Sequence, residues 1–234
     1  MPFDKHRMIR LAEIAAVFGV AGLTLLLGQG LAGKGMISAQ VPVIVANALM
    51  LLTVWVGLRV RGQGLDSLGL KFAPPPWRQA LALLGKACLT LLFAVAAFVA
   101  AAIVMANLIG MPEQADMSEY NPLAGNLPLL LICLPGVWLF ASLGEEILYR
   151  GFLIHRIEAL GSWSRPWIAV CLSAVAFGVA HYTWGLAGVV QTTCMGLALG
   201  VAFLTAKRNL WVTVLAHGAM DTILFVQMYL RAPA

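Results

Sequence analysis

Three groups of polar residues interrupt the apolar C-terminal half of the chain, and their types and spacing could support hydrolytic chemistry. They are Glu145, Glu146 and Arg150; His181, which follows Phe177 by four residues; and His217 with Asp221. An ionisable group inside a membrane span costs roughly 2.5 to 3.5 kcal/mol on insertion scales, so such groups are rare and usually functional. Two histidines and spare carboxylates on three apolar segments therefore favour one shared site over three separate structural contacts.

Helical geometry gives the two adjacent glutamates different tasks. Residues four apart on a helix face each other, whereas adjacent residues point about 100 degrees apart. Glu146 is therefore expected to form an ion pair with Arg150 that holds the rotation of the helix. Glu145 is left without a partner on its own helix. An unpaired carboxylate in such a place is a candidate general base or acid.

The two histidine groups repeat the four-residue spacing. The ring of Phe177 is expected to pack beside the imidazole of His181 and to limit its rotamers. The carboxylate of Asp221 can accept a hydrogen bond from one ring nitrogen of His217 and so fix which tautomer faces the site.

The elements that must position these residues are membrane-spanning helices. Of the 234 residues, 61% are hydrophobic and only 11% are charged, which excludes soluble enzymes, secreted disulfide scaffolds and disordered proteins. Apolar stretches that meet the length of roughly 20 residues needed to cross a bilayer predict an all-α polytopic transmembrane bundle of about seven helices. They are residues 11–30, 39–58, 81–109, 127–158, 167–184, 186–206 and 210–230.

The depth of each polar residue tests whether one site is possible. At about 1.5 Å rise per residue from the cytoplasmic ends, Glu145 lies about 20 Å deep, Asp221 about 18 Å, His217 about 12 Å and His181 about 21 Å. A tilted or broken fifth helix is needed to bring His181 to the others. Non-helical backbone at such depth is tolerated where it lines a cavity.

The distribution of basic residues predicts the orientation. Lysine and arginine gather at one set of helix ends, which is typical of the cytoplasmic side. This side carries Lys5, Arg7, Arg10, Arg59, Arg61, Lys71, Arg78, Arg156, Arg165, Lys207 and Arg208. The N-terminus is thus expected in the cytoplasm, the acidic loop 111–126 and the C-terminus outside, in a bacterial inner membrane. The net charge of +5 is scattered over helix ends, so a nucleic-acid partner is not expected.

The three groups, taken in order, resemble the CPBP family of intramembrane proteases, which includes CAAX prenyl proteases and Abi proteins. EEILYR matches EExxxR, FGVAH matches FxxxH and HGAMD matches HxxxN/D. The resemblance covers about 127–230. It implies a four-helix catalytic core in 127–234, after an N-terminal three-helix region and external loop in 1–126.

Residue by residue, the resemblance implies roles for the site. Glu145 would activate water with His181 assisting, Glu146 and Arg150 would support the site, and the third group would stabilise an oxyanion or bind an ion. The family is described both as metalloproteases and as metal-free glutamate proteases. Glu145, His181, His217 and Asp221 would suffice for a zinc ion with an open position, but HExxH is absent. Either no cofactor or a divalent metal such as zinc is therefore compatible with the sequence.

Two other functions use similar residues. A proton-coupled transporter also carries intramembrane Glu, His and Asp, but no inverted repeat is visible. A non-catalytic scaffold of the same fold would regulate a membrane partner, although the intact motifs favour an enzyme. For the enzyme, a peptide or membrane-protein substrate is expected at the lipid bilayer, because protein prenylation is not expected in bacteria.

Overall fold

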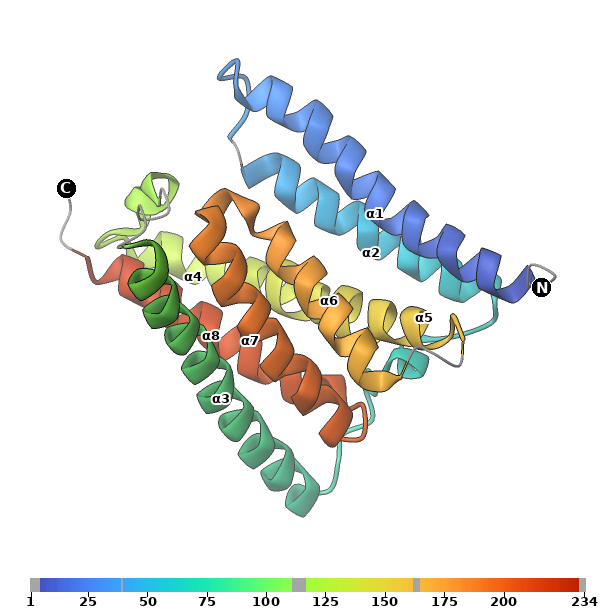
Figure 1. Ribbon diagram of the computed structural model, residues 1–234. Coiled ribbons are helices and arrows are strands. Elements are labelled where there is room, and N and C mark those ends of the chain that lie inside the picture. Colours follow the sequence, from blue (N-terminus) through green and yellow to red (C-terminus); the bar gives the residue numbers. More distant parts are fainter. Residues whose placement is uncertain (1–4, 39, 111–116, 162–164, 232–234) are drawn as a thin grey trace.

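The computed structural model describes residues 5–38, 40–110, 117–161 and 165–231, and every regular element in these ranges is helical (Figure 1). Six helical stretches are long and apolar enough to cross a membrane. They are α1 (Lys5–Ala32), α2 (Gln40–Val60), α3 (Trp77–Ile109), the continuous stretch Leu127–Glu158, Tyr182–Thr205 and α8 (Leu210–Tyr229). A seventh helix, α6 (Pro166–Ala180), is shorter. The predicted all-α bundle of about seven helices is confirmed.

The stretch Leu127–Glu158, which carries the paired glutamates, is not a plain α-helix. It begins as α4 (Leu127–Gly136), continues as two π-helical segments, η3 (Val137–Leu143) and η4 (Glu146–Leu153), and ends as α5 (Ile154–Glu158). Pro135, which has no N–H to donate, lies just before the first π segment. π-Helical turns are rare and concentrate at functional sites. Glu145 and Glu146 lie at the junction between the two segments.

The expected break in the fifth span is present at His181. Helix α6 ends at Ala180, and the 3₁₀ turn η5 (Tyr182–Trp184) leads into α7 (Gly185–Thr205). Gly185 has φ of 71°, a left-handed conformation that glycine adopts without strain. The amide of His181 donates to the carbonyl of Gly178 at 2.9 Å, so His181 is held at the corner between the two helices.

The glycines of the GxxxG pattern on α7 bring α6 close. A Cβ atom on Gly196 would lie 3.1 Å from Cδ1 of Phe177 and 3.3 Å from Cα of Ala174, and one on Gly200 would lie 2.7 Å from Cγ1 of Val170. Small residues at a helix contact in a membrane allow backbones to approach in this way. The pattern therefore serves packing within the chain. Helix α3 covers the other side of α7 and also packs along α8 (Figure 1).

The segment 62–79, whose three consecutive prolines are typical of a surface linker, is mostly exposed, but two of its leucines are buried. It contains the short 3₁₀ helix η1 (Leu65–Leu68), and both Leu68 and Leu70 are only 1% exposed. Gly69, at φ of 94°, accepts a hydrogen bond at 3.1 Å from the amide of Leu210, the first residue of α8. Leu68 and Leu70 thus belong to the hydrophobic core, and Leu68 packs beneath Gly151 of the stretch Leu127–Glu158.

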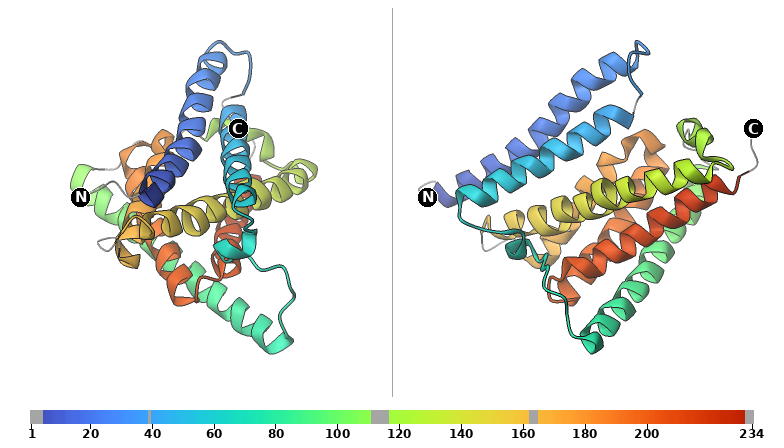
Figure 2. Two further views of the ribbon diagram at one scale, coloured as in Figure 1. Left: turned by 90° about the vertical axis from the view of Figure 1, so that its right-hand side faces the viewer. Right: turned by 180° about the vertical axis from the view of Figure 1, so that it is seen from behind.

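The helix ends form two faces, with the N- and C-terminal ends of the described chain on opposite sides (Figure 2). One face, called the arginine-rich face, carries the starts of α1, α3, α6 and α8 and the ends of α2, α5 and α7. Ion pairs join helices there. Glu13 pairs with Arg61 and Arg156, and Nη1 and Nη2 of Arg208 donate to the two carboxylate oxygens of Glu158 at 2.8 and 2.7 Å. The opposite face carries the other ends. Residues 111–116 of the acidic loop lie outside the described residues.

Candidate active site

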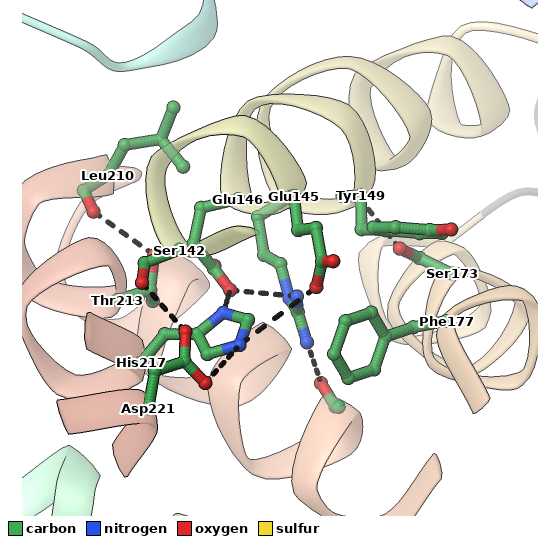
Figure 3. A network of polar contacts seen from close by, with 12 residues as sticks. Ser142, Glu145, Glu146, Tyr149, Ser173, Phe177, Leu210, Thr213, His217 and Asp221 are labelled. Carbon is green, nitrogen blue, oxygen red and sulfur yellow. Dashed lines mark hydrogen bonds and ion pairs between the residues drawn. The ribbon is translucent and has the colours of Figure 1, made fainter. Parts of the chain in front are cut away.

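Glu146 lies at the centre of a buried polar cluster (Figure 3). Its Oε1 accepts hydrogen bonds from Arg150 Nη1 at 2.8 Å and from His217 Nδ1 at 2.9 Å. The side chains of all three residues are at most 4% exposed. Arg150 also donates to the carbonyl of Gly196 at 3.3 Å and stacks on the ring of Phe177 at 4.5 Å. Through Oε1, Glu146 thus joins η4 to α8, while its Oε2 is buried and has no hydrogen-bond partner among the described residues.

Glu145, the neighbouring residue, is in a different state. Its carboxylate is 15% exposed and accepts no hydrogen bond from any residue in the described ranges; Oε2 lies 3.9 Å from His217 Nε2. In Figure 3 the carboxylate of Glu145 lies on the side of the cluster toward Phe177, and a dashed line joins it to the imidazole of His217. The adjacent positions therefore separate a bridging glutamate from an open one, although the local helix is π rather than α.

His217 and Asp221 are close but do not form the expected hydrogen bond. The distance from His217 Nε2 to Asp221 Oδ1 is 3.7 Å, longer than a hydrogen bond. Glu146 instead takes the role of holding the imidazole, through Nδ1. Asp221 is held from another helix, because Ser142 Oγ donates to its Oδ2 at 2.8 Å. Asp221 and Glu145 consequently face the same nitrogen from two sides.

Ser142 is a site residue that the sequence reasoning missed. It is fully buried on the π-helical stretch, one turn before Glu145. The signal in the sequence was a hydroxyl group in an otherwise apolar run, three residues before the EExxxR motif. It was not decisive, because a serine in a membrane helix more commonly bonds its own backbone. Only the placement of α8 shows that its partner is Asp221.

The ring of Phe177 lies between the two histidines. Its centroid is 4.8 Å from that of His181 and 5.9 Å from that of His217. His181 Nδ1 lies 2.9 Å from the carbonyl oxygen of Phe177. Because a carbonyl oxygen can only accept, Nδ1 carries the proton and Nε2 keeps a free lone pair. His181 can therefore accept a hydrogen bond from water through Nε2.

A tight contact between the π-helical stretch and α8 sets the relative position of the motifs. The indole of Trp138 covers Gly218, where a Cβ would lie 2.6 Å from Cζ3, and its Nε1 donates to Thr222 Oγ1 at 3.0 Å. Packing against Trp138 therefore explains why the residue after His217 is a glycine. A side chain there would push α8, and with it the imidazole, away from Glu146.

A cavity of about 540 Å³ reaches the cluster from between α3, α7 and α8. His181, His217 and Asp221 form one end of it. Most of the remaining lining is apolar, with Gln191, Gln227 and Arg231 as the larger polar side chains elsewhere on its wall. A largely apolar pocket with a few convergent polar groups is the usual form of a ligand or substrate site.

The metal hypothesis can be tested against the donor atoms. Within the ranges that the structure describes, no group of three or more His, Cys, Asp or Glu side chains is arranged to hold a metal ion. Nδ1 of His217 bonds Glu146 and Nδ1 of His181 bonds a backbone carbonyl, so only Nε2 of each ring is left for a ligand. As placed, the four candidates Glu145, His181, His217 and Asp221 do not form a zinc site.

The fold and the site define a polytopic membrane protein with a polar cluster at the end of a cavity. Residues 127–223 match the family model of the type II CAAX prenyl endopeptidase Rce1-like family. The resemblance to the CPBP proteases is thereby confirmed over this segment, which contains every residue of the cluster. Because this is a family of proteases, the match supports a peptidase. Neither the curated proteins nor the solved structures contain a match to the chain.

Proposed function

We propose that the chain is an intramembrane endopeptidase that hydrolyses a peptide bond with a water molecule activated by Glu145. The observation that carries this proposal is the difference between the adjacent glutamates. Glu146 is locked by Arg150 and His217, whereas the open carboxylate of Glu145 faces His217 Nε2 beside the cavity end. A general base must reach a bound water, and the partial exposure of Glu145 and its distance of 3.9 Å from Nε2 of the cavity-lining His217 support this role.

The first step is water activation. Glu145 takes a proton from a water that also donates to the free Nε2 of His181, and the resulting hydroxide attacks the carbonyl carbon of the substrate. The protonated Glu145 then delivers its proton to the departing amine, so the base of the first step becomes the acid of the second. No group of the chain is consumed in the cycle.

The second requirement is stabilisation of the oxyanion. Nδ1–H of His217 donates to Glu146, so an imidazolium form would present Nε2–H to the cavity. Three carboxylates, those of Glu145, Glu146 and Asp221, lie within 4 Å of this ring. An ionised Asp221 would repel a developing oxyanion. We therefore propose that Asp221 serves as a second hydrogen-bond donor to the oxyanion.

Asp221→Asn is expected to retain turnover. An amide also donates a hydrogen bond, and the Ser142 hydroxyl can serve either end of that amide because it both donates and accepts. Asp221→Leu, which removes the donor, should lose roughly 10²-fold or more, the cost of a missing oxyanion donor. The measurement is kcat of both purified variants.

Elemental analysis of the purified wild type accompanies this comparison. If Asp221 instead ligates a metal ion, the neutral amide is a poorer ligand, and bound metal and activity should fall together in Asp221→Asn. A stoichiometric ion in the wild type that is lost with activity in the variant would contradict the metal-free mechanism.

The proposed location is a bacterial inner membrane with the N-terminus in the cytoplasm and the C-terminus outside. The support is the arginine-rich face and the placement of the two ends on opposite sides. Reporter fusions after Ala234 and within 61–79 should report opposite compartments. Reports from the same compartment would contradict seven crossings.

The activity itself is tested by incubating the purified protein with a set of apolar peptides and identifying new termini by mass spectrometry. The proposal expects cleavage by the wild type and none by Glu145→Gln. A non-catalytic scaffold would give no products with either protein. A proton-coupled transporter would give no products but would acidify vesicles when its substrate is supplied.

A further inference from the structure

The cavity occupies only one half of the membrane bundle. Its lining from α3 comes from residues 95–106, in the second half of that helix; from α7 it comes from 187–195, in the first half; and from α8 it comes from 217–227, in the second half, with Arg231 just beyond the end of α8. All three segments lie toward the face opposite the arginine-rich face. Met117, which follows α3 on that face, also lines the cavity.

The other half of the bundle is filled. Leu199 and Phe203 of α7 and Leu210 of α8 are completely buried, and Leu68 of the linker is 1% exposed. The Glu146–Arg150 pair, at most 1% exposed, lies between this packing and the cavity. The site is thus closed toward the arginine-rich face by side chains from three parts of the chain.

We propose that the catalytic cavity opens to the face opposite the arginine-rich face, and that its substrates are apolar polypeptide segments presented there. The identity of the ligand as a peptide rests on the proposed peptidase function. The direction of the opening rests on the lining and on the packed inner half alone. Because lysine and arginine gather on the cytoplasmic side, the open face is the extracytoplasmic one.

The lining fits an extended peptide with apolar side chains. Val95, Phe98 and Met220 are among the apolar residues of the wall, while the amides of Gln191 and Gln227 can pair with the N–H and C=O groups of a backbone. From Asp221 to Tyr229, where α8 ends shortly before Arg231, the helix covers about 12 Å at 1.5 Å per residue. An extended chain of roughly four residues spans that length.

A consequence is that a substrate must reach the outer face before it is cleaved. A segment that is translocated, or that is anchored in the outer half of the membrane, meets this condition. A peptide that remains in the cytoplasm does not, because the Glu146–Arg150 pair and the packing below it separate it from Glu145.

The direction is tested by cysteine labelling in the full chain. Cys88, Cys133, Cys171 and Cys194 are first replaced by alanine, and Gln191→Cys is then introduced as the cavity probe. Lys34→Cys and Lys71→Cys serve as exposed references for the open and the arginine-rich face. A membrane-impermeant maleimide is applied to right-side-out and to inverted vesicles.

The proposal expects Gln191→Cys to be labelled in the same vesicles as Lys34→Cys and protected in those that label Lys71→Cys. Labelling together with Lys71→Cys, or no labelling in either preparation, would overturn it. Gln227→Cys, near the outer end of the cavity, replaces the probe if Gln191→Cys does not fold. None of these results depends on proteolysis, so they stand even if the chain is not a peptidase.

A second arm tests the presentation of the substrate. A charged, impermeant peptide with an apolar cleavage segment is supplied outside the two vesicle types. Cleavage is expected with right-side-out vesicles and, with inverted ones, only after detergent is added. Cleavage by intact inverted vesicles would overturn the proposal. So would a peptide that is cleaved in detergent but not by right-side-out vesicles.

Discussion

Glu145→Gln is expected to lower turnover by roughly 10²- to 10⁴-fold, the usual contribution of a general base, and to leave the folded protein intact. The amide has the same shape as the carboxylate but cannot take a proton from water. The folded state should tolerate it because Glu145 accepts no hydrogen bond in the described part of the chain and is partly exposed. The measurement is kcat with a cleavable peptide, alongside the yield of monodisperse protein.

The neighbouring Glu146→Gln is the matched control for this experiment, since it makes the same chemical change one residue later. Its defect should appear in the folded yield. If Glu146→Gln were stable and inactive while Glu145→Gln remained active, the roles assigned to the two residues would be reversed. Binding of an uncleaved peptide by Glu145→Gln would show, in addition, that only the chemical step is lost.

Contacts within one helix could be predicted from the sequence. The Glu146–Arg150 pair and the packing of Phe177 on His181 both follow from a spacing of four residues, and both are present at 2.8 Å and 4.8 Å. The break at His181 followed from depth, because a straight helix could not place it beside the other groups. These inferences succeed because spacing and rise along one helix are set by local backbone geometry.

Contacts between helices could not be predicted in the same way. His217 bonds Glu146 across 71 positions, and Ser142 bonds Asp221 across 79. Such pairs depend on the rotation of each helix about its axis, which hydropathy does not define for helices that are apolar on every side. The spacing of His217 and Asp221 was therefore misleading. It brings the two side chains to 3.7 Å, but the hydrogen bond of the imidazole forms with Glu146 on another helical segment.

The π-helical stretch and the burial of Leu68 and Leu70 in the linker 62–79 were also hidden in the sequence. An apolar run gives the length of a span but not its backbone register, and nothing in residues 137–153 marks i to i+5 hydrogen bonding except the preceding proline. The linker 62–79 has the prolines of a surface segment. The burial of Leu68 is understood only once it is seen beneath Gly151, where a Cβ on that glycine would lie 3.1 Å from Leu68.

Glu146→Gln is expected to destabilise the protein by about 3 to 5 kcal/mol, because it leaves the charge of Arg150 buried without a counter-ion. The amide oxygen can still accept from His217, so the loss should come chiefly from the arginine, whose side chain is 1% exposed. The measurement is the free energy of unfolding in mixed micelles.

The double variant Glu146→Gln with Arg150→Gln separates charge from shape. It removes the stranded cation but also the contacts of Arg150 with Gly196 and Phe177. If uncompensated charge is the cause, the double variant should be more stable than Glu146→Gln alone, although the arginine contacts are lost. If the free energies of the two single substitutions simply add, Arg150 acts through packing, and the buried pair does not hold the site by its charge.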